Sequence, residues 1–172
     1  MHLIREATRE DATAVAALLQ AYMLESYEQA WQGSIDQVLE DGFGARFRML
    51  VAADARQALG FLAWEKAYDL HHCLHGGQVL DLYVTRRYRA RGIAVQLIAR
   101  AAEAIHREGG AFLKGGALEG GAATRLYGRF APAFGNDYIL GGKAFRHLAA
   151  QARLPLRSLA RSMPRREWNF EP

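Results

Sequence analysis

The sequence predicts an α/β fold with a mixed, mainly antiparallel sheet flanked by helices. Three observations support this prediction. Several short segments are rich in apolar and β-branched residues and are bounded by polar turns, as strands are. Two longer segments, 11–23 and 93–108, carry apolar residues at helical spacing. The order of the segments places antiparallel hairpins first and a strand–helix–strand unit second, whose crossover we expect to be right-handed.

Length and composition are those of one globular domain. The chain has 172 residues, of which 51% are hydrophobic and 23% charged. No apolar run reaches the roughly 18 residues of a membrane span, and the N-terminus lacks a signal-peptide core. The single cysteine, Cys73, excludes an internal disulfide, so we expect a cytoplasmic protein. We expect one domain over residues 1–152 and a basic extension over 153–172.

The first half of the chain is expected to contain one strand, two helices and a hairpin. In order, these are strand 3–5, helix 11–23, a short helix to Leu39, strand 47–52 and strand 58–64. Thr8 and Asp11 resemble a capping box before the first helix, and Ser34 caps the second. The polar turn 54–57 predicts an antiparallel hairpin. We interpret residues 67–77 as a loop.

The second half is expected to contain the strand–helix–strand unit. In order, the segments are strand 78–84, basic turn 86–92, helix 93–108, strand 111–114, helix 122–130, strand 137–140 and a helix-like segment at 143–152. Gly109 and Gly110 end the long helix. Gly141 and Gly142 break the last strand. The place of 143–152 in the fold is left open.

The turn at 86–92 is the most informative segment for function. It connects a strand to the start of a helix, where backbone N–H groups and the helix dipole favour anions. Gly92 permits close approach of a phosphate, and Ala94 is nearly as small. Arg89 and Arg91 can add charge-assisted hydrogen bonds. We therefore predict a pyrophosphate ligand. The sequence has neither a Walker-type phosphate loop nor a glycine-rich dinucleotide motif.

These residues resemble a known family. Arg89-x-x-Gly92-x-Ala94 matches the Q/R-x-x-G-x-G/A signature of the GCN5-related N-acetyltransferases (GNAT). Segment 80–84 resembles the fourth strand of that family, and segment 4–12 resembles its usual opening. The element order is similar from residue 2 to about 140. The resemblance implies a GNAT-like fold and acetyl-CoA as co-substrate.

The resemblance also implies which residues bind acetyl-CoA. Pantetheine would pair with the backbone of the fourth strand like an added strand, and the pyrophosphate would sit on N–H groups of the turn. The implied cofactor-binding residues are Leu82, Tyr83, Val84, Arg89, Ala90, Arg91, Gly92, Ile93, Ala94 and Val95. The implied reaction is direct transfer of an acetyl group to the primary amine of a small molecule, through a tetrahedral intermediate.

Tyr127 is the candidate catalytic acid. Ala122-x-x-x-Leu126-Tyr127 resembles the family segment whose tyrosine protonates the departing thiolate. The alternative is a tyrosine that only packs in the core. The sequence also departs from the family pattern. Gly120 stands where relatives often have asparagine, and Ala131-Pro132 replace a frequent Gly-Phe.

The sequence does not decide which residues bind the acceptor amine or which group is the general base. Glu25, Tyr27 and Trp31, with Glu28 nearby, suit a cationic amine through charge and cation–π contacts. The alternative is a solvated helix end with one buried tryptophan. Asp81 lies on the central strand and serves either the structure or the acceptor site. A water chain can also remove the amine proton.

Two further features have no assigned role. The cluster from His71 to His75 is too short to close a zinc site, so we expect no metal; a loop beside the acceptor pocket, with one His as a possible base, is the alternative. Arg153, Arg157 and Arg161 share one helical face. This face suits a packing helix or a homodimer arm better than a nucleic-acid or membrane patch. Besides the enzyme, the alternatives are a non-catalytic acyl-CoA-binding module and, as the weaker one, a nucleic-acid-binding protein.

Overall fold

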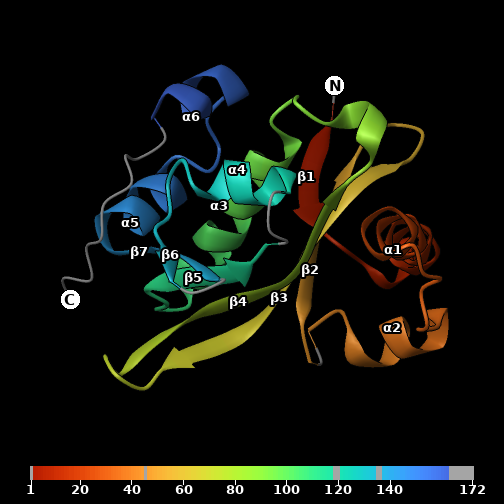
Figure 1. Cartoon of the computed structure of the whole chain (residues 1–172), viewed down its shortest axis with the longest axis horizontal. Helices are drawn as coiled ribbons and strands as arrows, with labels where there is room; N and C mark the ends of the chain where they lie inside the picture. Colours follow the sequence, from red (N-terminus) through yellow and green to blue (C-terminus); the bar gives the residue numbers. More distant parts are fainter. Residues whose placement is uncertain (1, 45, 118–120, 135–136, 163–172) are drawn as a thin grey trace. The chain divides into compact units, whose positions relative to one another are not determined.

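The chain folds into strands of a mixed, mainly antiparallel sheet with helices beside them, which confirms the predicted fold class (Figure 1). The computed structural model describes residues 2–44, 46–117, 121–134 and 137–162. The chain divides into two compact units. Unit 1 contains Met1–Glu65 and Leu80–Leu97, and unit 2 contains Lys66–Val79 and Ile98–Pro172.

Unit 1 holds the N-terminal strands and the first two helices. Its elements are β1 (Leu3–Glu6), a 3-10 turn (Arg9–Asp11), α1 (Ala12–Tyr27), α2 (Ile35–Asp41), β2 (Arg48–Ala53), the first part of β3 (Ala58–Asp69), the last part of β4 (Leu74–Val84), a 3-10 turn (Arg86–Tyr88) and the start of α3 (Ile93–Arg107). The strand order is β1-β2-β3-β4. Both β1–β2 and β2–β3 are antiparallel, and Leu50 pairs with Leu62. The hairpin predicted around 54–57 is therefore confirmed.

The core of unit 1 lies where α1 and α2 meet the sheet. Its buried members come from helices and strands alike and are Val15, Leu18, Val38, Met49, Val51, Phe61, Ala63 and Tyr83. The strand residues alternate along β2 and β3, so that every second side chain faces the helices. Figure 1 shows α1 and α2 next to each other in this unit. Ser34 caps α2, as predicted, and accepts a hydrogen bond from Gln37 N (3.2 Å).

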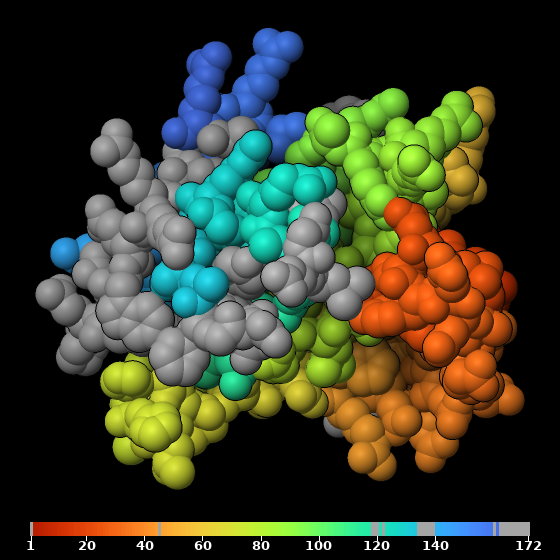
Figure 2. All heavy atoms as spheres, in the orientation of Figure 1, coloured from red at the N-terminus to blue at the C-terminus, as the bar shows by residue number. Residues whose placement is uncertain are grey.

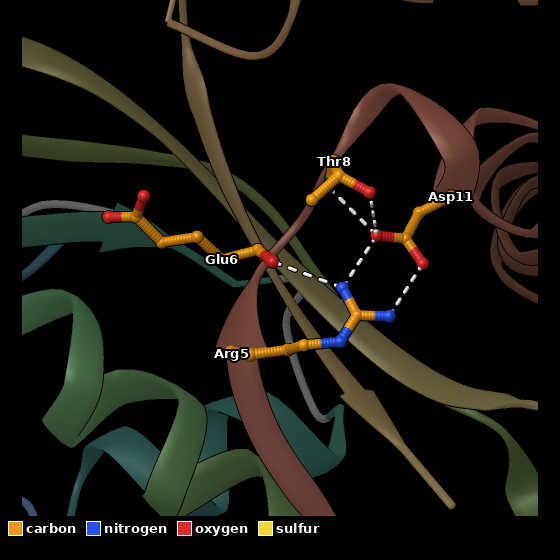
Figure 3. A network of polar contacts seen from close by, with 4 residues as sticks. All are labelled: Arg5, Glu6, Thr8 and Asp11. Carbon is orange, nitrogen blue, oxygen red and sulfur yellow. Dashed lines mark hydrogen bonds and ion pairs between the residues drawn. The ribbon is translucent and has the colours of Figure 1, made fainter. Parts of the chain in front are cut away.

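The start of α1 is held by the predicted capping box and by an ion pair (Figure 3). The Asp11 carboxylate accepts a hydrogen bond from the Thr8 backbone N–H at 2.8 Å. The same carboxylate accepts two bonds from the Arg5 guanidinium, at 2.6 and 2.8 Å. These bonds tie β1 to the helix start. They lower the pKa of Asp11 to about 2, with the bonds from Arg5 as the main cause.

We expect Asp11→Asn to destabilise the protein by about 1–2 kcal/mol at pH 7, because it removes the ion pair with Arg5 and leaves one acceptor oxygen where there were two. A carboxyl whose pKa is lower in the folded chain stabilises the fold above its unfolded pKa of about 4. That stabilisation is lost as the pH falls toward 2. Urea unfolding of both proteins at pH 7 and pH 2.5 measures this. The difference between them should shrink at pH 2.5, whereas Asp36→Asn, in the exposed first turn of α2, should change little at either pH.

Unit 2 holds the parallel strand pair and the C-terminal helices. Besides the end of β3, the start of β4 and α3 from Ile98 onward, it contains β5 (Phe112–Gly116), α4 (Ala122–Tyr127), β6 (Ala133–Phe134), β7 (Asp137–Gly141), α5 (Gly142–Ala150) and α6 (Leu156–Ser162). The strand order is β4-β5-β7-β6. β4 and β5 are parallel from Gly76↔Phe112 to Gln78↔Lys114, and β5–β7 and β7–β6 are antiparallel. The predicted strand–helix–strand unit is thus present.

The prediction of a loop at 67–77 is wrong. β3 continues to Asp69 and β4 begins at Leu74, so only a tight turn separates them. Polar and exposed residues fill this part of the hairpin, which gives no apolar alternation to detect. Local contacts hold it instead: the Tyr68 and His75 rings meet edge to face at 4.9 Å, and Asp69 accepts a bond from His71 N at 2.9 Å. Cys73, at the tip, is exposed and has φ +54°.

Other boundaries differ from expectation. α1 continues past residue 23 to Tyr27, whereas α4 ends at Tyr127 rather than at 130. The segment predicted as helix-like at 143–152 is α5, whose Phe145 and Leu148 are buried in unit 2. The two-residue strand β6 was not predicted, because it is too short for a periodic pattern. Helix α6 lies in the segment where the spacing of Arg157 and Arg161 suggested a packing helix.

The C-terminal extension packs on unit 2 through its first residues. Leu159 of α6 is fully buried, and Arg153 Nε donates to Glu103 Oε1 at 3.0 Å. These contacts favour a packing role for the first residues of the extension. The expected boundary between a domain over 1–152 and an extension over 153–172 stays a prediction. Gly120 and residues 163–172 lie outside the described residues. In the described part of the chain, no helix combines the length and the apolar character that a bilayer crossing needs.

Candidate active site

The turn between β4 and α3 has the backbone of an anion site. After the 3-10 turn Arg86–Tyr88, Arg89 is extended, and Ala90 then has φ +57°. Gly92 has φ +78°, and α3 begins at the next residue. Left-handed residues near a helix start turn successive N–H groups toward a common point and form an anion-binding nest. The first N–H groups of a helix also lack partners within the helix. These groups belong to Ala90 through Val95.

The side chains around this turn carry positive charge. Arg86, Arg87 and Arg91 are exposed. The Arg91 guanidinium lies 5.4 Å from the centre of the Tyr88 ring, and that of Arg87 lies at 5.9 Å from it. Tyr88 therefore keeps two cations next to the turn. The predicted contribution of Arg91 to phosphate binding is consistent with this exposure.

The Arg89 side chain points to α1. Its two terminal nitrogens donate to the two carboxylate oxygens of Glu25, at 2.5 and 2.8 Å, and its Nε donates to the Val84 carbonyl at 2.8 Å. Figure 2 shows the green atoms of the 85–92 turn against the orange-red atoms near the end of α1. The expected salt link from this side chain to phosphate stays a prediction, because the structure shows the guanidinium bound to Glu25 and Val84. The pair also lowers the pKa of Glu25.

A cluster of tyrosines and carboxylates lies beside this ion pair in unit 1. The Tyr83 hydroxyl donates to Glu25 at 3.2 Å, and Tyr22 contacts the rings of both Tyr27 and Tyr83. Burial raises the pKa of Asp81 on β4, and the nearby Tyr22 hydroxyl opposes that rise. Burial likewise raises the pKa of Tyr22.

The predicted acceptor residues therefore differ in what they do. Tyr27 is 44% exposed and its ring is available at the surface. Trp31 is half-buried against the core of unit 1, and its backbone N–H donates to Gln20 Oε1 at 3.1 Å. Glu25 is engaged by Arg89 and Tyr83. The acceptor role of Tyr27 and Asp81 stays a prediction, and the contacts of Trp31 are those of a packing residue.

Unit 2 contains a small, mainly apolar pocket that includes Tyr127. The lining comes from β4, α3, β5, the α4 region and β7, and consists of Val79, Ile98, Leu113, Lys114, Gly115, Tyr127, Phe130, Ala131 and Leu140. It lies just beyond Gln78↔Lys114, where the described pairing of β4 with β5 ends. A Cβ built on Gly115 would come within 3.0 Å of Val79 Cβ, so glycine keeps this space open.

Tyr127 is buried, with 7% of its surface exposed, and its ring meets Phe130 edge to face at 6.3 Å. Both possibilities left by the sequence are thus compatible with its place: it packs in unit 2, and it also lines the pocket. A phenol in such a position can give a proton to a thiolate that enters the pocket.

Sequence reasoning missed two contributors. Tyr22 falls within the helix predicted over 11–23, but a tyrosine at helical spacing gives no sign of where its hydroxyl points. Gly115 is one of 17 glycines in the sequence. Only the pairing of β4 with β5 shows that a side chain at this position would meet Val79. The His71–His75 segment lies at the hairpin tip, where His72 pairs with Asp69 at 2.8 Å. Among the described residues, no group of three or more His, Cys, Asp or Glu is placed to hold a metal.

Comparison with known proteins gives one family match. The model described as the acetyltransferase (GNAT) family matches residues 12–131. This range contains the β4–α3 turn, the tyrosine cluster and Tyr127. No curated protein matches the chain.

Solved structures share the fold. A ribosomal-protein-alanine N-acetyltransferase from Brucella melitensis biovar Abortus 2308 is 26% identical, with a TM-score of 0.64, over 78% of this chain and 94% of that chain. The PaiA N-acetyltransferase from Thermoplasma acidophilum, in complex with coenzyme A, is 14% identical (TM-score 0.58; 81% and 96% covered). An aminoglycoside acetyltransferase from an uncultured soil metagenomic sample, in complex with sisomicin, is 14% identical (TM-score 0.63; 74% and 85% covered).

Proposed function

Because the chain belongs to the acetyltransferase (GNAT) family, we propose that it is an acetyl-CoA-dependent N-acetyltransferase that acts on the primary amine of a small molecule. The observation that carries the proposal is the turn between β4 and α3. There, left-handed Ala90 and Gly92 lead into the helix, with arginines around the turn. This arrangement suits the pyrophosphate of acetyl-CoA. Structural relatives that contain coenzyme A support the same cofactor.

The proposed reaction is a direct transfer. The neutral amine nitrogen attacks the thioester carbonyl and forms the C–N bond of a tetrahedral intermediate. Collapse of that intermediate breaks the C–S bond. The amine loses one proton, and the departing thiolate gains one from Tyr127. The buried phenol of Tyr127 can serve as this acid. Asp81 is a candidate for the amine proton, because its raised pKa makes it a stronger base than an exposed aspartate.

The acceptor amine is proposed to bind beside Tyr27 and Asp81. The rings of Tyr22 and Tyr27 offer a cation–π surface, and the Asp81 carboxylate offers a negative charge. Small-molecule acceptors and protein N-termini both present such an amine. The structural relatives include a ribosomal-protein-alanine N-acetyltransferase and an aminoglycoside acetyltransferase.

Calorimetric titration with acetyl-CoA, followed by a screen of amines for thiol release, tests the proposal. We expect micromolar binding, with an affinity near 8 kcal/mol, and release of coenzyme A with at least one amine class. Binding without turnover across polyamines, amino acids, aminoglycosides and peptide N-termini would favour the non-catalytic acyl-CoA-binding module. Absence of acetyl-CoA binding would contradict both the enzyme and the acyl-CoA-binding module.

A further inference from the structure

The side chain of Arg89 makes three hydrogen bonds inside unit 1. Its Nε and both terminal nitrogens donate to Val84 O and to the two oxygens of Glu25, at 2.5–2.8 Å. A two-pronged arginine–carboxylate pair of this kind has a fixed geometry, unlike most surface ion pairs. The signature arginine therefore links the end of β4 to α1.

Tyr83 contacts both members of the Arg89–Glu25 pair. Its ring lies 5.4 Å from the Arg89 guanidinium, and its hydroxyl donates to Glu25 at 3.2 Å. The ring is buried in the core of unit 1. Because the buried Tyr83 contacts both partners, it restricts the carboxylate and the guanidinium relative to the sheet.

The fixed Arg89 directly precedes the unusual backbone of the turn. Ala90 has φ +57°, a conformation that costs about 1 kcal/mol or more for a residue with a Cβ. Such a residue persists only where its surroundings hold it. The direction of the N–H groups of Ala90, Arg91 and Gly92 depends on this conformation. The Arg89 anchor is the nearest tertiary contact that can maintain it.

We propose that Glu25 is a positioning residue for acetyl-CoA: through its pair with Arg89 it holds the β4–α3 turn in the conformation that binds the pyrophosphate. Arg89 acts as an anchor of the turn, and the backbone N–H groups contact the phosphates. This inference rests on the proposed function. It changes the role of Glu25 from acceptor binding to preparation of the cofactor site.

The proposal and a direct salt link from Arg89 to phosphate predict opposite signs for Glu25→Gln. Removal of the carboxylate frees Arg89, so a direct salt link predicts unchanged or tighter binding of acetyl-CoA. The positioning role predicts binding that is about five- to tenfold weaker. Arg89→Lys should give a similar loss, because an ammonium cannot make the same three bonds. The double variant should lose no more than either single variant.

A second readout separates positioning from general destabilisation. S-Acetylpantetheine carries the thioester but no pyrophosphate, so its KM and kcat should be the same in Glu25→Gln as in the native protein. For acetyl-CoA, KM should rise while kcat changes little. Glu40→Gln removes an exposed carboxylate of α2 and is the matched control, with binding of acetyl-CoA unchanged.

The outcomes are distinct. Failure of the native protein to bind acetyl-CoA contradicts the proposed function itself. Native binding together with unaltered or tighter binding by Glu25→Gln overturns the positioning role alone. A rise in the KM of the amine, with unaltered affinity for acetyl-CoA, would return Glu25 to the acceptor site. Equal losses for acetyl-CoA and S-acetylpantetheine would indicate misfolding, which a lower Tm would report, and would also overturn the proposal.

Discussion

Gly92→Glu should abolish the binding of acetyl-CoA, with a loss of affinity of at least about 100-fold. Gly92 has φ +78°, so a residue with a Cβ strains the turn or changes its path. The new carboxylate would also lie among the N–H groups that we assign to the pyrophosphate. Like charges at such short range repel strongly where water is partly excluded. Both effects act in the same direction.

Calorimetric titration measures this loss, and Gly109→Glu is its control. Gly109 also has a left-handed backbone, with φ +84°, and a Cβ there meets nothing within 4 Å. The same substitution therefore introduces the same charge and comparable strain, but at the end of α3. We expect Gly109→Glu to bind acetyl-CoA like the native protein. Retention of native affinity by Gly92→Glu would rule out the turn as the phosphate site.

Tyr127→Phe should lower kcat by about 100-fold or more, because it removes the proposed acid without removing the ring. The ring packs against Phe130 and lines the pocket of unit 2, so phenylalanine should preserve the local structure. The affinity for acetyl-CoA should change little. A fall in kcat with unchanged binding is the signature of an interaction made in the chemical step.

Steady-state kinetics and titration on the same preparation provide the test. Tyr68→Phe removes an exposed hydroxyl from the hairpin of unit 2 and should leave kcat unchanged. Native activity in Tyr127→Phe would leave this tyrosine with its packing role only. The enzyme would then have to protonate the thiolate from water, which leaves the acetyltransferase reaction itself possible.

The sequence allowed most of the fold to be predicted, because its strongest signals are local. Thr8 and Asp11 form the capping box, Ser34 caps α2, and the apolar stripe of α3 is periodic over fifteen residues. The distal part of the β3–β4 hairpin could not be found in the same way. Its side chains are exposed on both faces, so pairing of the backbone, rather than burial, holds it together.

The site was predictable in its backbone and less so in its side chains. A glycine such as Gly92 indicates a left-handed backbone, because few other residues adopt one. Ala90 is also left-handed, but an alanine gives no such indication in the sequence. The partner of Arg89 was not predictable, since Glu25 is 64 residues away along the chain. Charge alone suggested that Arg89 binds phosphate and Glu25 an amine. In the folded chain, the two neutralise each other.

The position of Cys73 affects how any of these assays is carried out. It is the only thiol of the chain and it is exposed at the tip of the hairpin. An aromatic disulfide reagent that reports released coenzyme A will therefore also react once with each protein molecule. That first equivalent serves as an internal concentration standard in every progress curve. The same thiol accepts a single fluorophore, and Cys73→Ser supplies the background-free enzyme.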